Sequence, residues 1–519
     1  MISRPSLHRA PAGDAAAAAP TDLLRRLDGR FLLPPPPDGA FAHLVILGGP
    51  PGLAEVAEAA GIARRVSAGL PPEGSADALF LLRDARVAPE RAARCLASGG
   101  CAWLELESRR WAPRKVPLRV TGRYAVLPGF ERSAAYVPAD PPGPRRWYAE
   151  TLQPAWTLGK ALRRAASKWG RDPLARSFAL TAVAGRESQG PASMLDHPAL
   201  PSWLRGLHPL LLAHGPDRVV VLPFAPGASS PAGVLKVPRL PLFNDRTEGE
   251  QALLAHLRAR LDRVARSALP EPRGVYPGGG LAMSLESYAA GRPLAQRMGG
   301  WGEPLRNKLE DLREATEWLA GFHRRTEVRR AEWGAGEAAE WIDGPLGDFG
   351  QAFGAGAALD RLTAAVRRRS GELAGAALPV VCRHRDFTPW NLLRGDGGLR
   401  VIDWEGARPG PALCDLLHFS THWSELALRT FDEGARLRVF REVWIARRGG
   451  EPGEAVRRRV AAYCEALRLD RRFVPLLLVA TWVELALRQG LGSREASYVG
   501  VLAAEADGLF GAWNEAGWR

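Results

Sequence analysis

The first 190 residues alternate short apolar runs with amphipathic stretches. Three apolar runs predict strands and the two stretches between them predict helices: 42–49, 76–84 and 101–108 for the strands, 53–61 and 88–100 for the helices. Alternation of this kind predicts a parallel, doubly wound sheet. We expect residues 177–186, another apolar run, to add a late strand to the same sheet.

The pattern changes after residue 204. Short apolar runs separated by Gly/Pro turns predict strands at 208–215, 218–227 and 233–239, and a further strand runs into a turn over 281–294. Apolar residues at helical spacing predict helices over 247–265 and 302–326, and residues 410–519 are mostly helical in pattern. This order predicts a small sheet with one helix, followed by a mostly helical region.

These patterns divide the chain into two domains, as its 519 residues favour. We expect an α/β Rossmann-like domain over 1–188 and a linker over 189–203, where turn-favouring residues are frequent. An α+β bilobal domain should follow over 204–519, with a sheet-containing lobe at about 204–290 and a helical lobe at about 291–519.

Composition indicates a globular protein, with 46% hydrophobic and 24% charged residues. The five cysteines form no CxxC pair, so a disulfide framework or a structural zinc site is not expected. No stretch near the N-terminus has the length of a signal peptide's apolar core, and the apolar run 473–487 is too short to cross a bilayer. We therefore expect a cytoplasmic protein and a buried helix at 473–487.

The net charge of +14 is concentrated in residues 109–171, which hold 14 basic and 3 acidic residues interleaved with aromatic ones. Such a segment can contact a membrane surface or a partner protein. The alternative is a solvated arginine-rich face whose aromatic side chains lie in the core. No motif indicates nucleic-acid binding.

Candidate chemistry is concentrated in residues 384–403, which read HRDFTPWNLLRGDGGLRVID. Two apolar-alternating runs flank Asp396-Gly397 and predict a hairpin in which position i pairs with about 793 minus i. This pairing places Asn391 opposite position 402, next to Asp403, and amide and carboxylate oxygens suit Mg²⁺. Asp386, five residues before Asn391, could accept or orient a hydroxyl proton.

These residues carry a resemblance to a known family. HRDFTPWN resembles the HxDxxxxN catalytic loop, and IDWE the metal-binding segment, of the aminoglycoside phosphotransferase/choline kinase-like family, whose members have a protein-kinase-like fold. The resemblance covers about 204–519. It implies that Asp386 is the catalytic base and that Asn391 and Asp403 are magnesium ligands. It also implies supporting roles for His384 and for Asp415, which matches the aspartate of the family's DLA segment and should brace the loop.

The same resemblance implies a nucleotide site upstream. Lys236 in GVLKVPR matches the family's phosphate-binding lysine, and Glu250 is the expected acid partner, with Glu248 as the competing choice. ESYAAGRPL resembles the hinge that binds adenine through its backbone, and His323 in FHRRT matches a structural histidine. The loop HGPDR lacks the serines that many relatives use to hold the nucleotide; APGASSPAG, in the next hairpin, could substitute.

The N-terminal region resembles a class I SAM-dependent methyltransferase domain over about 20–188. The resemblance depends on the GGPPG turn after the first strand, on ASGGCAWLELE and on the late strand at 177–186. Pro51 lies inside the turn, and the strand expected within 63–74 has no acidic residue directly at its end to hold a ribose. We expect a degenerate, non-catalytic relative; an active methyltransferase would bind SAM.

The sequence therefore predicts a phosphotransferase that uses ATP and Mg²⁺ to phosphorylate a hydroxyl of a small molecule such as a sugar or an amino-alcohol. Residues 405–519 should form the acceptor pocket. Acids would bind a cationic acceptor and rings would stack on a sugar: the acids are Glu405, Asp415 and Glu425, and the rings Trp404, Trp423 and His418. The alternative is a non-catalytic nucleotide-binding scaffold that docks a membrane or a partner enzyme through 109–171.

Overall fold

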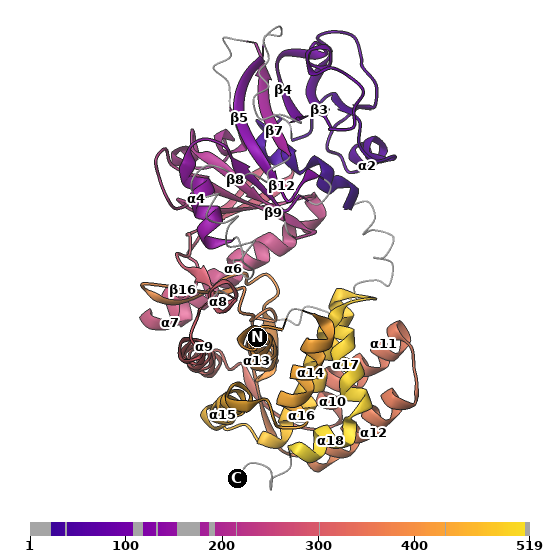
Figure 1. Cartoon of the computed structure of the whole chain (residues 1–519), viewed down its shortest axis with the longest axis vertical. Helices are drawn as coiled ribbons and strands as arrows, with labels where there is room; N and C mark the ends of the chain where they lie inside the picture. The colour runs from indigo at the N-terminus through magenta and orange to yellow at the C-terminus, as the bar shows by residue number, and fades with distance from the viewer. Residues whose placement is uncertain are drawn as a thin grey trace. The chain divides into compact units, whose positions relative to one another are not determined.

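The structure is a computed structural model of the 519-residue chain. It describes residues 22–36, 39–106, 118–130, 133–152, 177–185, 192–213, 215–299, 302–430 and 432–513. The chain forms two compact units (Figure 1). The first comprises Met1–Gln153, Leu162–Ala252 and Glu271–Tyr288; the second comprises Pro154–Ala161, Leu253–Pro270 and Ala289–Arg519.

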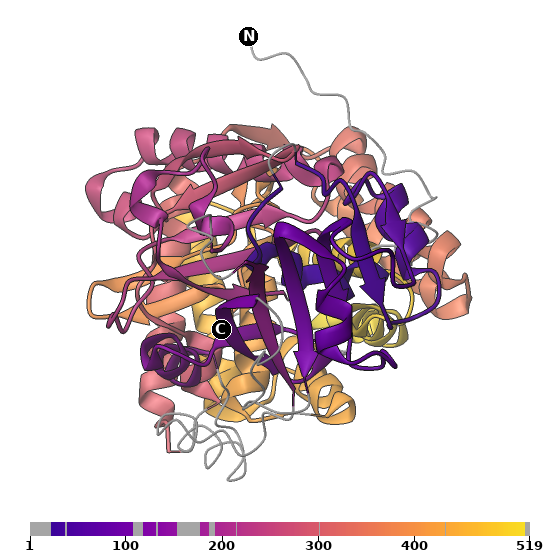
Figure 2. The ribbon, with the colours of Figure 1, turned by 90° about the horizontal axis from the view of Figure 1, so that it is seen from above.

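The first unit is built on one twelve-stranded sheet, and Figure 2 shows some of its N-terminal strands side by side. The strands are β1 (Leu44–Leu47), β2 (Val66–Ser67), β3 (Ala76–Leu81), β4 (Leu96–Leu106), β5 (Leu118–Leu127), β6 (Ala135–Pro138), β7 (Phe178–Ala184), β8 (His208–Leu212), β9 (Arg218–Phe224), β10 (Val234–Pro238), β11 (Pro272–Gly278) and β12 (Leu281–Glu286). Their order is β11-β12-β10-β9-β8-β6-β5-β7-β4-β3-β1-β2.

The N-terminal strands form a mixed sheet where an all-parallel one was expected. Strands β2, β1, β3 and β4 are parallel, whereas β7 is antiparallel to both β4 and β5. The predicted strands at 42–49, 76–84, 101–108 and 177–186 are present as β1, β3, β4 and β7. The helix predicted over 88–100 is shorter, because α3 (Pro89–Ala93) ends before β4 begins at Leu96, and Gly99 has a positive φ of 83°.

The sheet continues across the expected domain boundary. Strands β6 and β8 pair antiparallel, with Ala135 opposite Leu212 and Tyr136 opposite Leu211. One hydrophobic core follows a face of the sheet from Leu44 in β1 to Leu285 in β12. The boundary between the two compact units therefore does not lie at 189–203.

The described part of the expected linker is folded against this core. It holds two 3₁₀ helices, η3 (Met194–Asp196) and η4 (Ser202–Leu204), and Ser193 and Asp196 form a capping box at the first. Met194, Leu195 and Leu200 are buried in the core. Because these apolar side chains pack into the core, the described part of this segment is not a solvent-exposed linker.

Helix α6 (Asn244–Arg260) follows β10 and is the helix predicted over 247–265, with α7 (Arg263–Ser267) completing that span. The sheet's opposite face has two smaller apolar clusters, one of which includes Trp147 from α4 (Pro142–Thr151). Tyr124, Phe130 and Tyr136 are also buried. The aromatic residues described within 109–171 are thus mostly core residues, while 107–117, 131–132 and 153–176 lie outside the described residues.

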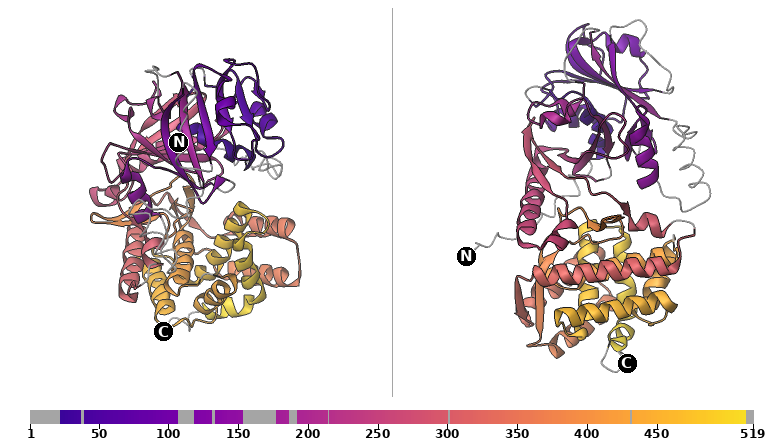
Figure 3. Two further views of the ribbon diagram at one scale, coloured as in Figure 1. Left: turned by 45° about the horizontal axis from the view of Figure 1, so that its top comes forward. Right: turned by 90° about the vertical axis from the view of Figure 1, so that its left-hand side faces the viewer.

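The second unit is mainly helical. Its helices include α8 (Leu294–Met298), α9 (Leu305–Arg325), α10 (Ala335–Ala338), α11 (Gly344–Phe353), α12 (Ala357–Glu372), α13 (Cys414–Ala427), α14 (Glu433–Trp444), α15 (Gly450–Leu467), α16 (Val474–Gln489), α17 (Arg494–Ala504) and α18 (Ala506–Ala512). The long helices α9 and α15 pack side by side, as the right-hand view of Figure 3 shows. A single hydrophobic core joins the helices.

Two small sheets hold the loops of interest in the second unit. One has the order β13 (Arg292–Pro293), β16 (Leu392–Gly395), β17 (Gly398–Val401). The other has the order β14 (Arg329–Glu332), β15 (Ala377–Arg383), β18 (Arg408–Pro411). The loop between β15 and β16 contains Asp386 and Asn391.

The apolar run at 473–487 forms α16, most of whose side chains are buried. Among the described helices, none combines the length and the apolar character that a membrane span requires.

Candidate active site

The predicted hairpin is present with the predicted register. Strands β16 and β17 pair with Gly395 opposite Gly398 and Leu392 opposite Val401. The N–H of Ile402 donates to the carbonyl oxygen of Asn391 at 3.0 Å. Asn391 therefore lies opposite position 402, one residue from Asp403.

Asn391 is bonded directly to Asp386. Its amide nitrogen donates to the Oδ2 atom of Asp386 at 2.7 Å and to the carbonyl oxygen of the same residue at 2.9 Å. Both hydrogen bonds of the amide nitrogen stay within the loop. The amide oxygen of Asn391 is therefore the atom that could bind a cation. Burial raises the pKa of the Asp386 carboxyl, and the negative charge of Asp403 raises it further, while the Asn391 hydrogen bond opposes the rise. A carboxylate with a raised pKa accepts a proton more readily near neutral pH.

Backbone strain is found around these side chains. Arg385, Asp403 and Leu413 all have positive φ angles, of 65°, 70° and 82°. Such angles are uncommon for residues with side chains, and they persist only where neighbouring contacts hold them. Arg385 precedes Asp386, Asp403 is itself a site residue, and Leu413 lies two residues before Asp415, so the surroundings impose these backbone positions.

Asp415 supplies part of that restraint. Its carboxylate accepts hydrogen bonds from the backbone N–H of His384 at 2.6 Å and of Arg385 at 2.9 Å. Burial alone would raise the pKa of Asp415, but the contact with His323 and the charge of Arg383 hold it well below its usual range. The side chain of His384 reaches the other strand of the site, because its Nε2 lies 2.9 Å from the carbonyl oxygen of Ile402.

A buried tyrosine connects this restraint to the helices. The hydroxyl of Tyr463 on α15 accepts from the N–H of Leu413 and bonds Nδ1 of His323 on α9. The other ring nitrogen of His323 lies 3.5 Å from Asp415. His323 is fully buried. Nothing in the local sequence around Tyr463 indicated this role, because the contact joins segments 140 residues apart.

Glu484 is a second restraint that the sequence analysis did not identify. It accepts from Arg383 at 2.8 Å, from Arg385 at 2.7 Å and from Arg408 at 3.2 Å. Burial would raise its pKa, but the three guanidinium groups lower the pKa of Glu484 to about 2. One acid within the apolar run 473–487 was the available signal, since a buried acid needs cationic partners.

In the first unit, Lys236 is held by two carboxylates. Its Nζ lies 2.7 Å from Oε1 of Glu250 and 3.0 Å from Oε1 of Glu286. Arg218 donates to the other oxygen of Glu250 at 2.8 Å. Glu248, the competing choice, is exposed.

Glu286 was also missed, although the strand register predicts it. Lys236 in β10 pairs with Ser284 in β12, so Glu286, two residues further along, shares the face of Lys236. Burial raises the pKa of Glu286 to about 7, and the charge of Glu250 contributes, while Lys236 opposes the rise. Ser284, the Gln251 amide and one oxygen of Glu286 are buried without a hydrogen-bond partner among the described residues. A polar ligand beside Lys236 would satisfy such atoms.

The residues proposed to contact the acceptor are placed differently from the expectation. Trp404 and Trp423 are 1% and 0% exposed, and their indole N–H groups donate to the carbonyl oxygens of Val401 and Lys308. They are core residues, so the expectation that they stack on a sugar was wrong. Glu405 is exposed.

Two further acceptor candidates are buried. Glu425 bonds the hydroxyl of Tyr498 and lies 3.3 Å from Nδ1 of His422, which leaves it poorly suited to bind a cation. His418 packs edge-on against His422 and Trp482.

The Gly-rich turn after β1 is closed by a side chain of the protein. The N–H of Gly49 donates to both carboxylate oxygens of Asp84, at 2.8 and 3.0 Å. Gly48, Gly49 and Gly52 all have positive φ angles. The glycines fit the tight turn, but Asp84 occupies a donor that a cofactor would use.

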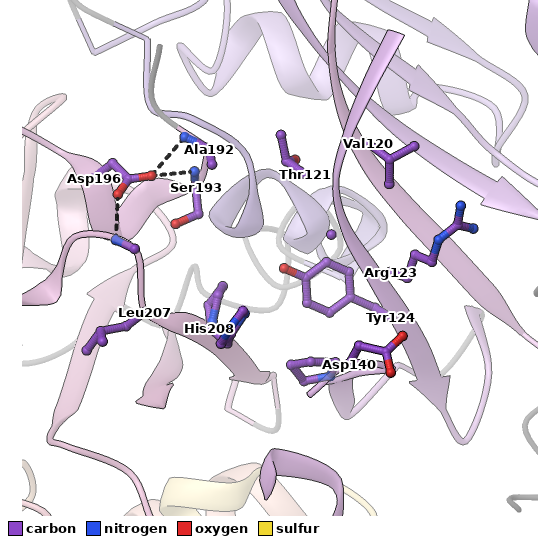
Figure 4. A pocket seen from close by; sticks show the side chains of 14 residues that line it. Val120, Thr121, Arg123, Tyr124, Asp140, Ala192, Ser193, Asp196, Leu207 and His208 are labelled. Carbon is purple, nitrogen blue, oxygen red and sulfur yellow. Dashed lines mark hydrogen bonds between the residues drawn. The ribbon is translucent and has the colours of Figure 1, made fainter. Parts of the chain in front are cut away.

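A cavity of about 310 Å³ opens beside β5 in the first unit (Figure 4). The Asp196 carboxylate accepts hydrogen bonds there from the N–H groups of Ala192, Ser193 and Gly206. Arg123 and Asp140 also line the cavity, so its charges are mixed. None of the predicted site residues lines this cavity. The Asp196 carboxylate is used to hold the local turn.

A protein-family model matches part of the chain. Residues 228–463 match the model of the phosphotransferase enzyme family (APH), a span that includes Lys236, Glu250, Asp386, Asn391 and Asp403. No protein of curated function matches the sequence.

Solved structures similar to the chain include the following three, all at low identity. A choline/ethanolamine kinase family protein from Mesorhizobium loti is 15% identical, with 62% of this chain and 92% of that chain covered and a TM-score of 0.33. Choline kinase from Cryptosporidium parvum is 11% identical, with 62% and 92% covered and a TM-score of 0.32. Aminoglycoside phosphotransferase APH(4)-Ia, in complex with AMP-PNP and hygromycin B, is 14% identical, with 59% and 95% covered and a TM-score of 0.36. The C-terminal region of this chain, over residues 228–463, is thus the part that matches the phosphotransferase enzyme family.

Proposed function

We propose that this protein is an ATP- and magnesium-dependent phosphotransferase that moves the γ-phosphoryl group of ATP to a hydroxyl of a small molecule. The observation that carries the proposal is the Asn391–Asp386 hydrogen bond of 2.7 Å at the end of a hairpin, with the charge of Asp403 acting on Asp386. The family match over 228–463 supports it.

Each residue has a role in this proposal. The acceptor oxygen forms a bond to the γ-phosphorus while the bond from that phosphorus to the β-phosphate oxygen breaks, and ADP leaves. Asp386 orients the acceptor hydroxyl and takes its proton. Lys236 places positive charge beside the phosphates, and Glu250 fixes the position of Lys236. Because such transfers need little covalent participation by the protein, positioning and charge stabilisation provide the rate.

The donor atoms fit magnesium. The amide oxygen of Asn391 and the carboxylate of Asp403 are hard oxygen ligands. No group of three or more His, Cys, Asp or Glu side chains suited to a metal occurs within the described ranges. The ion would therefore complete its shell with phosphate oxygens and water, as Mg²⁺ usually does. When bound, it neutralises charge on the phosphates.

The proposal is tested by the thermal midpoint of the full chain with ATP or GTP, with and without magnesium, for the wild type and Asp403→Ala. SAM is measured alongside. A ligand at about 100 times its Kd should add roughly 2.7 kcal/mol to the stability of the part it binds. A nucleotide shift that needs magnesium and is lost in Asp403→Ala supports the proposal. No shift with either nucleotide at millimolar concentration contradicts it, and a shift with SAM would revive a methyltransferase role.

A second candidate is a non-catalytic nucleotide-binding scaffold. One observation favours it: Glu286 is a second carboxylate on Lys236, so a phosphate must compete with it. The two candidates differ in turnover. Incubation with γ-labelled ATP and a deproteinised small-molecule extract should label a new product with the wild type and not with Asp386→Asn. Nucleotide binding without any labelled product would favour the scaffold.

A further inference from the structure

One arginine near Asp386 in the second unit has no part in the loop's ion pairs. Arg488, at the end of α16, donates to the carbonyl oxygen of Arg385 at 2.9 Å, one peptide before Asp386. Its charge acts on Asp386 and opposes the rise in the pKa of that carboxyl caused by burial and Asp403. Arg488 is exposed and forms no ion pair with any described residue.

Further basic side chains extend this group. His418 and His422 on α13 are in ring contact, with centroids 4.9 Å apart. Arg494, the first residue of α17, has an Nη2 atom 3.4 Å from Nε2 of His422. Burial lowers the pKa of His418 well below its usual range; the neighbouring His422, Arg488 and Arg494 lower it further, and the charge of Asp415 opposes the fall. We call Arg488, Arg494, His418 and His422 the basic cluster.

Apart from the site residues Asp386 and Asp403, the acids described near the basic cluster already have partners. Asp415 accepts two backbone N–H groups, and Glu425 bonds Tyr498 and His422. Glu484 is surrounded by three arginines, and Glu495 pairs with Arg494 at 3.0 Å. Of the three acids that the sequence assigned to a cationic acceptor, only Glu405 is exposed. The basic cluster therefore has more groups suited to bind an anion than groups suited to bind a cation.

The start of α17 adds to this preference. The helix spans 11 residues from Arg494, and the side chain of its N-cap residue, Ser493, makes no capping hydrogen bond. The Ser493 hydroxyl oxygen is buried and has no partner among the described residues. Helix N-termini carry partial positive charge and free N–H donors, which favour an anion.

We propose that the acceptor carries an anionic group, either a carboxylate or a phosphate ester, which Arg488 and Arg494 bind. This inference rests on the proposed phosphotransferase function and names its substrate class. Arginine suits both groups, because its planar guanidinium can donate two parallel hydrogen bonds to a carboxylate or a phosphate. The anion would lie beside Arg488, and the acceptor hydroxyl would then face Asp386.

The test measures ADP release by the full chain with ATP and magnesium for four compounds of one carbon skeleton: glucose, gluconate, glucose 6-phosphate and glucosamine. At least one of the two anionic compounds should exceed glucose and glucosamine by about tenfold or more in kcat/KM. Arg488→Gln and Arg494→Gln should each raise the KM for that acceptor about tenfold, with the KM for ATP within about twofold. Arg488→Lys should recover part of the loss, and Arg324→Gln, an exposed arginine on α9, is the matched control.

The outcomes are separable. Fastest turnover with glucosamine or glucose overturns the proposal. So does a fall in kcat for Arg488→Gln with no effect of Arg494→Gln, which would place Arg488 at the transferred phosphoryl group. If nucleotide and magnesium do not raise the thermal midpoint, the proposed phosphotransferase function itself is rejected, and the anionic acceptor with it.

If none of the four compounds is phosphorylated, binding decides. Gluconate and glucose 6-phosphate are then titrated calorimetrically into the protein saturated with ADP and magnesium. Binding of one of them, weakened about tenfold in both glutamine variants and unchanged in Arg324→Gln, supports the proposal and identifies the anion type. Absence of binding by both overturns it.

Discussion

Asp28 and Arg239 form a two-point ion pair between segments 211 residues apart, with both side chains fully buried. Nε of Arg239 lies 2.8 Å from Oδ1 of Asp28, and Nη2 lies 2.7 Å from Oδ2. Asp28 belongs to η1 (Arg25–Leu32), and Arg239 directly follows β10, three residues after Lys236. The N-terminal segment therefore holds the end of the strand that carries the expected phosphate-binding lysine.

We expect Asp28→Asn to lower the free energy of unfolding of the first unit by about 3–5 kcal/mol, because it leaves a buried guanidinium without its counter-charge. Urea unfolding measures the change. Asp22→Asn is the control, since Asp22 is exposed and lies 3.7 Å from the partly buried Arg25. The double variant Asp28→Leu/Arg239→Met should recover much of the loss, and a loss below about 1 kcal/mol in Asp28→Asn would refute the account.

Asp386→Asn should reduce phosphoryl transfer by about 10²–10⁴-fold while nucleotide binding persists, because the amide cannot take the acceptor proton. Label transfer from γ-labelled ATP gives the rate, and the thermal shift gives the binding. Asp396→Asn, in the exposed turn of the same hairpin, should keep the wild-type rate. Equal rates for the wild type and Asp386→Asn would remove Asp386 from the mechanism.

Glu286 should make stability depend on pH. Its pKa is raised from 4.5 to about 7 in the folded protein, so the folded state binds this proton more tightly than the unfolded state does. The resulting stability is complete below about pH 4.5 and is lost as the pH rises through 7, an effect of up to about 3 kcal/mol.

Glu286→Gln removes that loss, because the amide stays neutral at every pH. Urea unfolding between about pH 5 and pH 8 should therefore show a smaller decline for Glu286→Gln than for the wild type. Glu271→Gln, at an exposed position before β11, should retain the wild-type slope. Parallel curves for all three proteins would exclude Glu286 as the titrating group.

Glu484→Gln should destabilise the second unit by about 3–5 kcal/mol, since the largely buried Arg383 and Arg385 would lose a partly buried counter-charge. Turnover should also fall, because Arg385 precedes Asp386. Chemical unfolding and label transfer measure the two effects. Glu454→Gln removes an exposed i,i+4 partner of Arg458 and should change stability by less than about 0.5 kcal/mol. A similar small change for Glu484→Gln would mean that the arginines find other partners.

Local patterns predicted the parts of the site that neighbouring residues determine. The hairpin register places Asn391 opposite Ile402, and the turn at Asp396-Gly397 is sufficient to predict it. The pairing of Lys236 with Glu250 required the resemblance to a family as well, because fourteen residues separate the two.

Contacts between distant segments could not be predicted in this way. The pairing of β6 with β8 depends on strands whose own sequences do not specify a neighbour, so two domains were expected where one sheet exists. Trp404 and Trp423 were assigned to the acceptor because aromatic residues occur both in cores and at ligand sites, and only packing distinguishes the two. Tyr463 acts through a segment 140 residues away.

The junction of β6 and β8 also limits how this protein can be shortened or rearranged. A version that begins near residue 204 would present β8 as an open edge, with unpaired N–H and C=O groups above an uncovered apolar face, and such edges recruit other chains. The part of the chain after about residue 204 and the part before it are therefore expected to fold together. Gene fission between them would yield fragments that aggregate or must find each other, so the two parts are expected to be inherited as one piece.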